Sequence, residues 1–198
     1  MPDVYANITS VAKPVVEQIA NVLELRATDS QQRLMREAYL SEVAFPPNAR
    51  ALDVGCGTGA LTRVLAEWAN VNAVVGLDPS PILLDRARQR SMTYSGLAFE
   101  EGDARALPFD ASSFDLTLFH TTLCHVPEPE RALVEAFRVL RPGGWLAVFD
   151  GDYATTSVAI GDFDPLQACV AAWVGSSVHD RWLLRRLPAM LVRSGSRW

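Results

Sequence analysis

The sequence has no long apolar run. No segment approaches the ~20 uninterrupted apolar residues that a membrane-spanning helix needs. Residues 1–10 have neither the basic start nor the apolar stretch of a secretion signal. We therefore expect no membrane partner.

Positive charge and cysteine are also scarce. The 18 Lys and Arg against 23 Asp and Glu give a net charge of −5, with no basic stripe. DNA and RNA are therefore not expected as partners. Cys56, Cys124 and Cys169 are scattered and form no Cys-x-x-Cys pair. This spacing argues against a disulfide framework and against a structural zinc site. It suits a reducing compartment, so the cytoplasm is the expected location. No other group of residues has metal-ligand spacing, so no metal is expected.

What is present is the composition of one folded domain. The 198 residues are 49% hydrophobic and 21% charged, which suffices for one sizeable core. Residues 1–45 are predicted to form a helical cap, because apolar residues recur with a helical period over 11–23 and a second helical stretch covers 30–43. Pro46 and Pro47 end this cap.

Strands and helices alternate over residues 46–150. The predicted strands cover 51–54, 72–77, 97–101, 114–119 and 145–149. The alternation indicates an α/β fold, a doubly wound, Rossmann-like and mostly parallel sheet with helices on both faces. All strand carboxyl ends then lie at one edge, where ligands bind. Pro142-Gly143-Gly144 is expected to end the last helix before the fifth strand.

A glycine-rich turn follows the first strand. It reads Asp53-Val54-Gly55-Cys56-Gly57-Thr58-Gly59, and its glycines permit a tight turn and close approach of a ligand. The acid at Asp53 would repel a pyrophosphate but suits a ligand with a positively charged amino-acid end. The Gly-x-Gly-x-Gly spacing also differs from the dinucleotide-binding Gly-x-Gly-x-x-Gly, because Ala60 follows Gly59.

Two further acids end the next two strands. Asp78 is placed to accept both hydroxyls of a ribose, although an Asp before Pro79 also suits a simple turn. The third strand ends in Gly102-Asp103-Ala104. There the Asp103 carboxylate can accept the adenine amino group and the Ala104 amide can donate to a ring nitrogen.

These motifs together resemble a known family. LDVGCGTG, GLDPS, EEGDARALPF and SFDLTLFHTTLCHVPEPERALVEAFRVLRPGGWLAVFD, within residues 51–150, are similar to those of the class I S-adenosylmethionine-dependent methyltransferases, of the small-molecule type 11 kind. The resemblance implies that the turn with Asp53, Gly55, Cys56, Gly57 and Gly59 holds the methionine end of the cofactor. It also implies Pro79 against the adenine, and His120 under the ribose and methionine.

Methyl transfer needs a general base only if the acceptor must lose a proton. The sequence offers His120, His125 and the acids of Asp150-Gly151-Asp152-Tyr153, and Asp152 is the acid favoured. For His125 a purely structural role is the competing interpretation. The helices before Phe45 are expected either to wall the acceptor pocket or only to pack.

One departure from the family concerns residues 151–198. The family sheet ends in an antiparallel hairpin, but here residues 164–177 and 181–192 are predicted to be helical, so the sheet is expected to lack that hairpin. The fifth strand would then be an apolar edge. We expect either the helices after Asp150 or a second subunit, giving a homodimer, to cover it.

The expected function is methyl transfer from S-adenosylmethionine to a small organic acceptor at O, N or C. One alternative is a protein that binds S-adenosylmethionine without catalysis or without methyl transfer. A nicotinamide-dependent oxidoreductase is the other, disfavoured by Asp53 and the glycine spacing. The acceptor itself is not predicted, because fold does not settle substrate.

Overall fold

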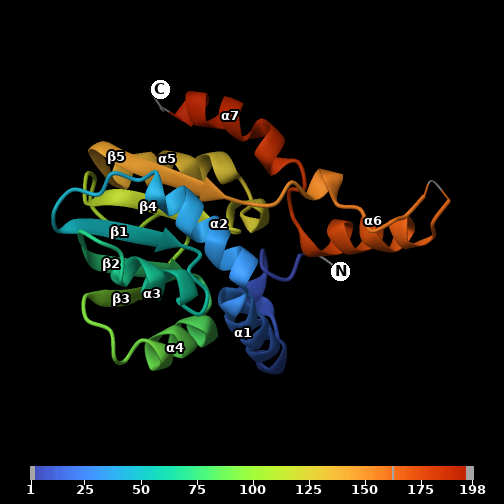
Figure 1. Cartoon of the computed structure of the whole chain (residues 1–198), viewed down its shortest axis with the longest axis horizontal. Helices are drawn as coiled ribbons and strands as arrows, with labels where there is room; N and C mark the ends of the chain where they lie inside the picture. Colours follow the sequence, from blue (N-terminus) through green and yellow to red (C-terminus); the bar gives the residue numbers. More distant parts are fainter. Residues whose placement is uncertain (1–2, 162, 195–198) are drawn as a thin grey trace.

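The computed structural model describes residues 3–161 and 163–194. Residues 1–2 of the predicted cap, and residues 162 and 195–198 of the segment 151–198, lie outside the described residues. One sheet contains five parallel strands in the order β3-β2-β1-β4-β5 (Figure 1). The strands are β1 (Ala49–Val54), β2 (Val71–Asp78), β3 (Leu97–Glu101), β4 (Phe114–His120) and β5 (Leu140–Phe149). The predicted α/β architecture and the alternation of strand and helix are confirmed.

Seven α-helices and three short 3-10 helices accompany the sheet within the described residues. The α-helices are α1 (Lys13–Thr28), α2 (Ser30–Ser41), α3 (Ala60–Ala66), α4 (Pro81–Arg90), α5 (Pro129–Val139), α6 (Leu166–Ser177) and α7 (Leu183–Ser194). The 3-10 helices are η1 (Ile8–Ser10), η2 (Leu123–His125) and η3 (Tyr153–Thr155).

The two faces of the sheet bury separate clusters. Successive strand residues point to opposite faces, so Leu52 and Val54 join the cluster under α5 and α7, whereas Ala51, Leu116 and Leu118 join the cluster under α2 and α3. Strands covered on both sides carry nearly continuous apolar runs, as parallel strands do. The sheet is therefore a rigid base that fixes where each strand ends.

Local sequence signals begin the helices that flank the binding edge. Ser80 caps α4 as predicted, with its Oγ accepting from the Leu83 amide at 3.4 Å. Asp29 caps α2 in the same way, accepting from the Gln32 amide at 2.9 Å. These caps satisfy amide donors that the first helical turn leaves free.

Two predicted boundaries near β4 and β5 were wrong. The helix before the fifth strand, α5, ends at Val139, and β5 already begins at Leu140 instead of Trp145. Pro142-Gly143-Gly144 therefore lies inside β5, where the register with β4 shifts between Phe114 and Leu116. Proline and glycine at a strand bulge give the same sequence signal as a helix stop. His120 is the last residue of β4 and not a residue beyond it.

The segment after β5 is helical, as predicted, and adds no strand to the sheet within the described residues. Leu187 and Met190 of α7 join the cluster that also holds Leu133 and Ala136 of α5, whereas α6 projects away from the sheet (Figure 1). β5 remains an edge strand, and Trp145 on it is 41% exposed. Cover of this edge by a second subunit stays a prediction. Within the described residues, no helix is both long enough and apolar enough to cross a membrane.

Candidate functional site

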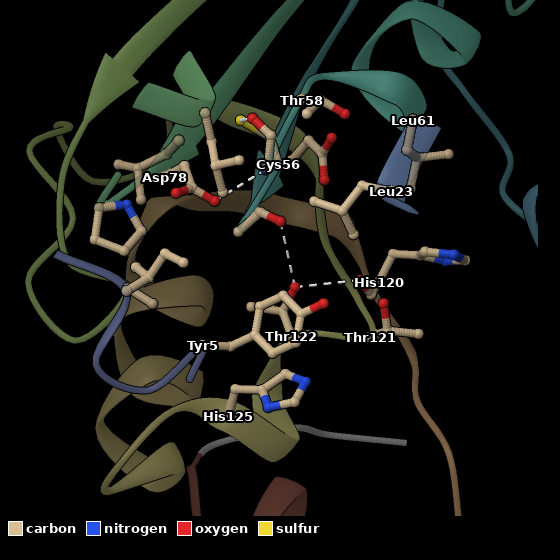
Figure 2. Close-up of a pocket in the computed structure, with 18 of the residues that line it drawn as sticks. Tyr5, Leu23, Cys56, Thr58, Leu61, Asp78, His120, Thr121, Thr122 and His125 are labelled. Atoms are coloured by element: carbon tan, nitrogen blue, oxygen red, sulfur yellow. Dashed lines mark hydrogen bonds between the residues drawn. The ribbon is translucent and has the colours of Figure 1, made fainter. Parts of the chain in front are cut away.

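A cavity of ≈ 360 Å³ lies at the carboxyl ends of β1, β2 and β4. The strand order reverses between β1 and β4, and this is the point where doubly wound sheets bind ligands. Residues of the amino-terminal segment, α1 and α2 line the cavity from the other side. Figure 2 shows Asp78 on one side of it, His120 on the other, and Tyr5 with His125 at a further end. Its volume is in the range of small-molecule pockets, about 300–1,000 Å³.

The glycine-rich turn forms the floor of the cavity. Gly55 and Gly57 have φ of 75° and 55°, and the Gly55 amide donates to Leu77 O at 2.7 Å. A Cβ at Gly55 would overlap the Thr122 side chain, and one at Gly57 would lie 3.0 Å from Leu23 Cδ1. Both glycines are therefore favoured by the backbone conformation and by the close packing of Thr122, which follows β4, and of Leu23 in α1.

Asp53 is buried at the end of β1 and lines the cavity. Its Oδ2 accepts a hydrogen bond from Thr62 Oγ1 at 2.7 Å. The pKa of Asp53 is raised to about 7, chiefly by burial; the hydrogen bond from Thr62 lowers it and the nearby Asp78 carboxylate raises it. This carboxyl group is thus poised to ionise when a positively charged group arrives.

Asp78 is held by two backbone amides. The Gly57 amide donates to its Oδ2 and the Ser80 amide to its Oδ1, each at 2.9 Å. Its pKa is raised to about 6, because burial raises it more than the two amide hydrogen bonds lower it. Each carboxylate oxygen has a second lone pair available for a ligand hydroxyl. Asp78 therefore connects the glycine-rich turn to the start of α4 and still faces the cavity.

Asp103 also lines the cavity, but its carboxylate forms an ion pair with Arg105. Arg105 Nη2 donates to Asp103 Oδ2 at 2.6 Å and Arg105 Nε to Oδ1 at 3.0 Å. The hydrogen bonds from Arg105 hold the pKa of Asp103 below its usual range. Ala104 lines the cavity beside it, while Gly102 packs behind against Leu77.

His120 is fixed in orientation by two aromatic residues. Its Nδ1 is hydrogen-bonded to the Tyr39 hydroxyl at 2.9 Å, and its ring stacks on Phe149 with centroids 4.8 Å apart. Burial, together with the charges of Arg36 and Arg26, lowers the pKa of His120 to about 4. The imidazole is therefore neutral at pH 7 and a weak base.

His125 lies at another part of the cavity and anchors the amino-terminal segment. Its Nδ1 donates to Asp3 Oδ2 at 2.7 Å, and its ring is 4.6 Å from that of Tyr5. The His179 amide also donates to Asp3 Oδ2, at 2.8 Å. Asp3 thus ties η2 and the segment before α7 to the start of the chain, which is the structural role weighed for His125.

The remaining predicted residues divide into two groups. Cys56 and Pro79 line the cavity, whereas Gly59, Gly102 and Asp152 do not. Gly59 begins α3 with a φ of 72° and packs on Phe99. Asp152 pairs with Arg185 of α7 at 3.3 Å, so the structure does not bring it together with the two histidines.

Sequence reasoning named no residue of the wall formed by α1 and α2. The side chains of this wall that line the cavity are those of Leu23, Arg26, Ala27, Gln32 and Arg36. No motif marks them, because their positions depend on how the helices dock on the sheet. The one signal available was the resemblance, which allowed for a cap that walls the pocket.

Comparison with known proteins agrees with this geometry. The family described as methyltransferase domain matches residues 52–148. The chain is 33% identical to the demethylmenaquinone methyltransferase of Renibacterium salmoninarum, over 98% of this chain and 72% of that protein. It is 29% identical to an uncharacterized 37.1 kDa protein in a transposon of Streptomyces fradiae, over 93% of this chain and 54% of that one.

A solved structure shows the same fold. The SAM dependent methyltransferase from Aquifex aeolicus aligns with a TM-score of 0.68 and 17% identity, over 94% of this chain and 89% of that chain. The chain belongs to the class I S-adenosylmethionine-dependent methyltransferases, and S-adenosylmethionine is the cofactor of this family. It spans about half the length of the Streptomyces relative and under three quarters of the Renibacterium enzyme.

Proposed function

We propose that the protein transfers a methyl group from S-adenosylmethionine to a small organic acceptor at an oxygen, nitrogen or carbon atom. The observation that supports this most is that Asp53, Asp78 and Asp103 line one cavity from the ends of three successive strands. Their oxygens can serve the amino-acid end, the ribose and the adenine amino group of one ligand. Asp53 at the glycine-rich turn would oppose a pyrophosphate, which together with the glycine spacing disfavours a nicotinamide dinucleotide.

The residues present fit the cofactor. Asp78 would accept the ribose hydroxyls while its amide partners hold it in place, and Asp53 would face the ammonium of the methionine end. Thr58 is buried on the cavity and its Oγ1 has no hydrogen-bond partner among the described residues, so a polar ligand atom would satisfy it. Asp103 would receive the adenine amino group beside Arg105.

The chemistry requires little covalent help from the protein. When bound, the cofactor supplies an electrophilic methyl group on a sulfonium, so the protein mainly aligns the acceptor and excludes water. Tyr5 and Leu23 line the cavity from the cap side and would cover a bound cofactor there. His120 and His125 are the base candidates that line it; Asp152 lies elsewhere.

The names of the relatives suggest which acceptor to test first. One relative is a demethylmenaquinone methyltransferase, so an aromatic quinol is the first acceptor to test. The cytoplasmic location, the homodimer and the absence of a nucleic-acid partner stay predictions from the sequence.

Calorimetric titration with S-adenosylhomocysteine tests the proposal. The parent protein, Asp78→Asn and Asp85→Asn are compared, with NAD titrated in parallel. Asp85 is the matched control, because it is an exposed acid on α4 that pairs with Arg88 and does not line the cavity. Asp78→Asn turns one oxygen into an amino group against a backbone amide donor and removes the charge, so we expect affinity to fall about tenfold or more.

The outcomes separate the alternatives. Saturable binding that Asp78→Asn weakens and Asp85→Asn preserves supports the proposal, provided that circular dichroism shows both variants folded. Formation of a methylated quinol with parent protein then establishes catalysis. Binding of NAD but not of S-adenosylhomocysteine would favour the oxidoreductase. Binding without any methylated product across an acceptor panel would favour a non-methylating relative.

A further inference from the structure

Arg36 is a buried cation without an acidic partner. The residue is 7% exposed and is the single basic residue among the buried polar residues of the described chain. Its Nη2 donates to Ala27 O, in the last turn of α1, at 2.8 Å. No carboxylate of the described residues forms an ion pair with it, and its burial lowers its pKa.

Two other partly buried arginines have such partners. Arg63 pairs with Glu24 at 3.0 Å, and Arg138 pairs with Glu135 at 2.7 Å. Burying a charge without a counter-ion is unfavourable. The cost at Arg36 is offset if a ligand brings the counter-charge, and Arg36 lines the cavity where such a ligand would bind.

A second cation stands on the same wall. Arg26 of α1 lines the cavity and forms no ion pair with a described residue. Both charges lower the pKa of His120, and all three side chains line the same cavity. Because His120 is a weak base, an acceptor hydroxyl at this wall needs another way to become nucleophilic.

We propose that Arg36, assisted by Arg26, binds the acceptor as an oxyanion, so that the acceptors are acidic hydroxyl compounds such as phenols, enols and quinols. This inference rests on the proposed function. The guanidinium stabilises the oxyanion, and the hydroxyl proton leaves to solvent when the acceptor binds. On the strand-end side of the cavity Asp53 and Asp78 oppose a bound anion. With the cofactor in place, Asp53 would pair with the ammonium of its methionine end and Asp78 would accept its ribose hydroxyls, which reduces that opposition.

The cofactor carries an anion of its own, the α-carboxylate of its methionine end. Arg26 is exposed to solvent, so this single carboxylate can pair with the buried Arg36 in place of an acceptor anion. The two sources of negative charge are distinguished by measuring cofactor affinity and acceptor ionisation separately.

The experiment uses 4-nitrophenol, whose phenolate absorbs visible light, with protein saturated by S-adenosylhomocysteine. The absorbance is titrated with pH for the parent protein, Arg36→Gln, Arg36→Lys and Arg33→Gln. Arg33 is the matched control, an exposed arginine of α2 that pairs with Glu37 and does not line the cavity. We expect bound phenol to ionise about one pH unit lower in the parent, a tenfold preference for the phenolate.

Loss of this shift in Arg36→Gln, partial retention in Arg36→Lys and full retention in Arg33→Gln support the inference. No shift in a parent protein that binds S-adenosylhomocysteine overturns it, as does the same shift in Arg36→Gln. A loss of affinity for S-adenosylhomocysteine in Arg36→Gln, with affinity for 5′-methylthioadenosine unchanged, would assign Arg36 to the α-carboxylate and overturn the inference. Failure of the parent to bind S-adenosylhomocysteine would instead overturn the proposed function.

Discussion

The two walls of the cavity differ in charge and in origin. The strand-end wall is acidic, with Asp53 and Asp78 buried beside the glycine-rich turn, whereas the cap wall carries Arg26 and Arg36. The first wall is built from turns that each follow one strand, the second from helices that dock on it. A bound cofactor would face the acids, and the acceptor would meet the cations. Our proposals assign one wall to the cofactor and the other to the acceptor.

A few contacts hold the two walls together. Glu24 of α1 pairs with Arg63 of α3, and both side chains are less than 15% exposed; Arg63 Nη1 also donates to Thr58 O at 2.9 Å. Tyr39 of α2 is hydrogen-bonded to His120 at the end of β4. The cap is therefore attached to the cofactor turn itself, which supports a role in forming the pocket in addition to packing.

The largest expected effect concerns the charge of the acidic wall. Burial raises the pKa of Asp53 from 3.8 to about 7. The stability that comes from its neutral form is fully present below the unfolded pKa and is lost as pH rises through the folded pKa. In the parent, the free energy of unfolding should therefore fall between about pH 4 and about pH 8, by about 1.4 kcal/mol per unit by which the pKa is raised. In Asp53→Asn, which keeps an oxygen for Thr62, we expect this part of the fall to be absent.

Urea unfolding of the unliganded protein at several pH values measures this effect. Asp85→Asn, an exposed acid on α4, should leave the pH dependence of the parent unchanged. If Asp53→Asn also left the pH dependence of the free energy of unfolding unchanged, Asp53 would already be ionised in the folded protein. The acidic wall would then be fully charged at neutral pH, and its contrast with the cap wall would be sharper than described.

The next effect concerns the backbone of the glycine-rich turn. Gly55→Ala places a Cβ against Thr122 at a residue with a φ of 75°. Strain and overlap together are expected to lower the free energy of unfolding by about 2–4 kcal/mol. Gly143→Ala is the matched control, because Gly143 has a φ of 82° but no atom within 4 Å of an added Cβ. Its loss should be about 1–2 kcal/mol, from strain alone.

Thermal and urea unfolding measure the loss of stability in both variants and in the double variant Gly55→Ala/Thr122→Ala. The comparison separates the part of the loss that comes from overlap with Thr122 from the part that comes from backbone strain. The double variant should recover part of the loss. Equal losses at the two glycines, with no recovery, would mean that the turn moves away from β4 at little cost. The strand-end wall would then be less rigid than the packing around Gly55 indicates.

The strand-end wall is also the part that the sequence predicted. The strands, the turn from Asp53 to Gly59, and the acids Asp78 and Asp103 follow from patterns within a few residues of each other. The pairing of Asp103 with Arg105 was missed, because a charged pair two residues apart in a loop carries no periodic signal. Arg36 was missed for a different reason. Arginine is usually exposed, and its burial here depends on the docking of α1, α2 and the sheet.

The smallest expected effect probes the link between the walls. Tyr39→Phe removes the hydroxyl that bonds His120 Nδ1 but keeps the ring, which lies 5.5 Å from that of Phe149. We expect a loss of about 0.5–1.5 kcal/mol in the free energy of unfolding. Tyr94→Phe, whose hydroxyl has no recorded side-chain hydrogen bond within residues 3–161 and 163–194, should lose less. Affinity for S-adenosylhomocysteine should stay within about twofold of the parent's, because the acidic wall is untouched. A large loss of affinity in Tyr39→Phe would show that α2 positions the cofactor through His120. The cap wall would then contribute to cofactor binding as well as to acceptor binding.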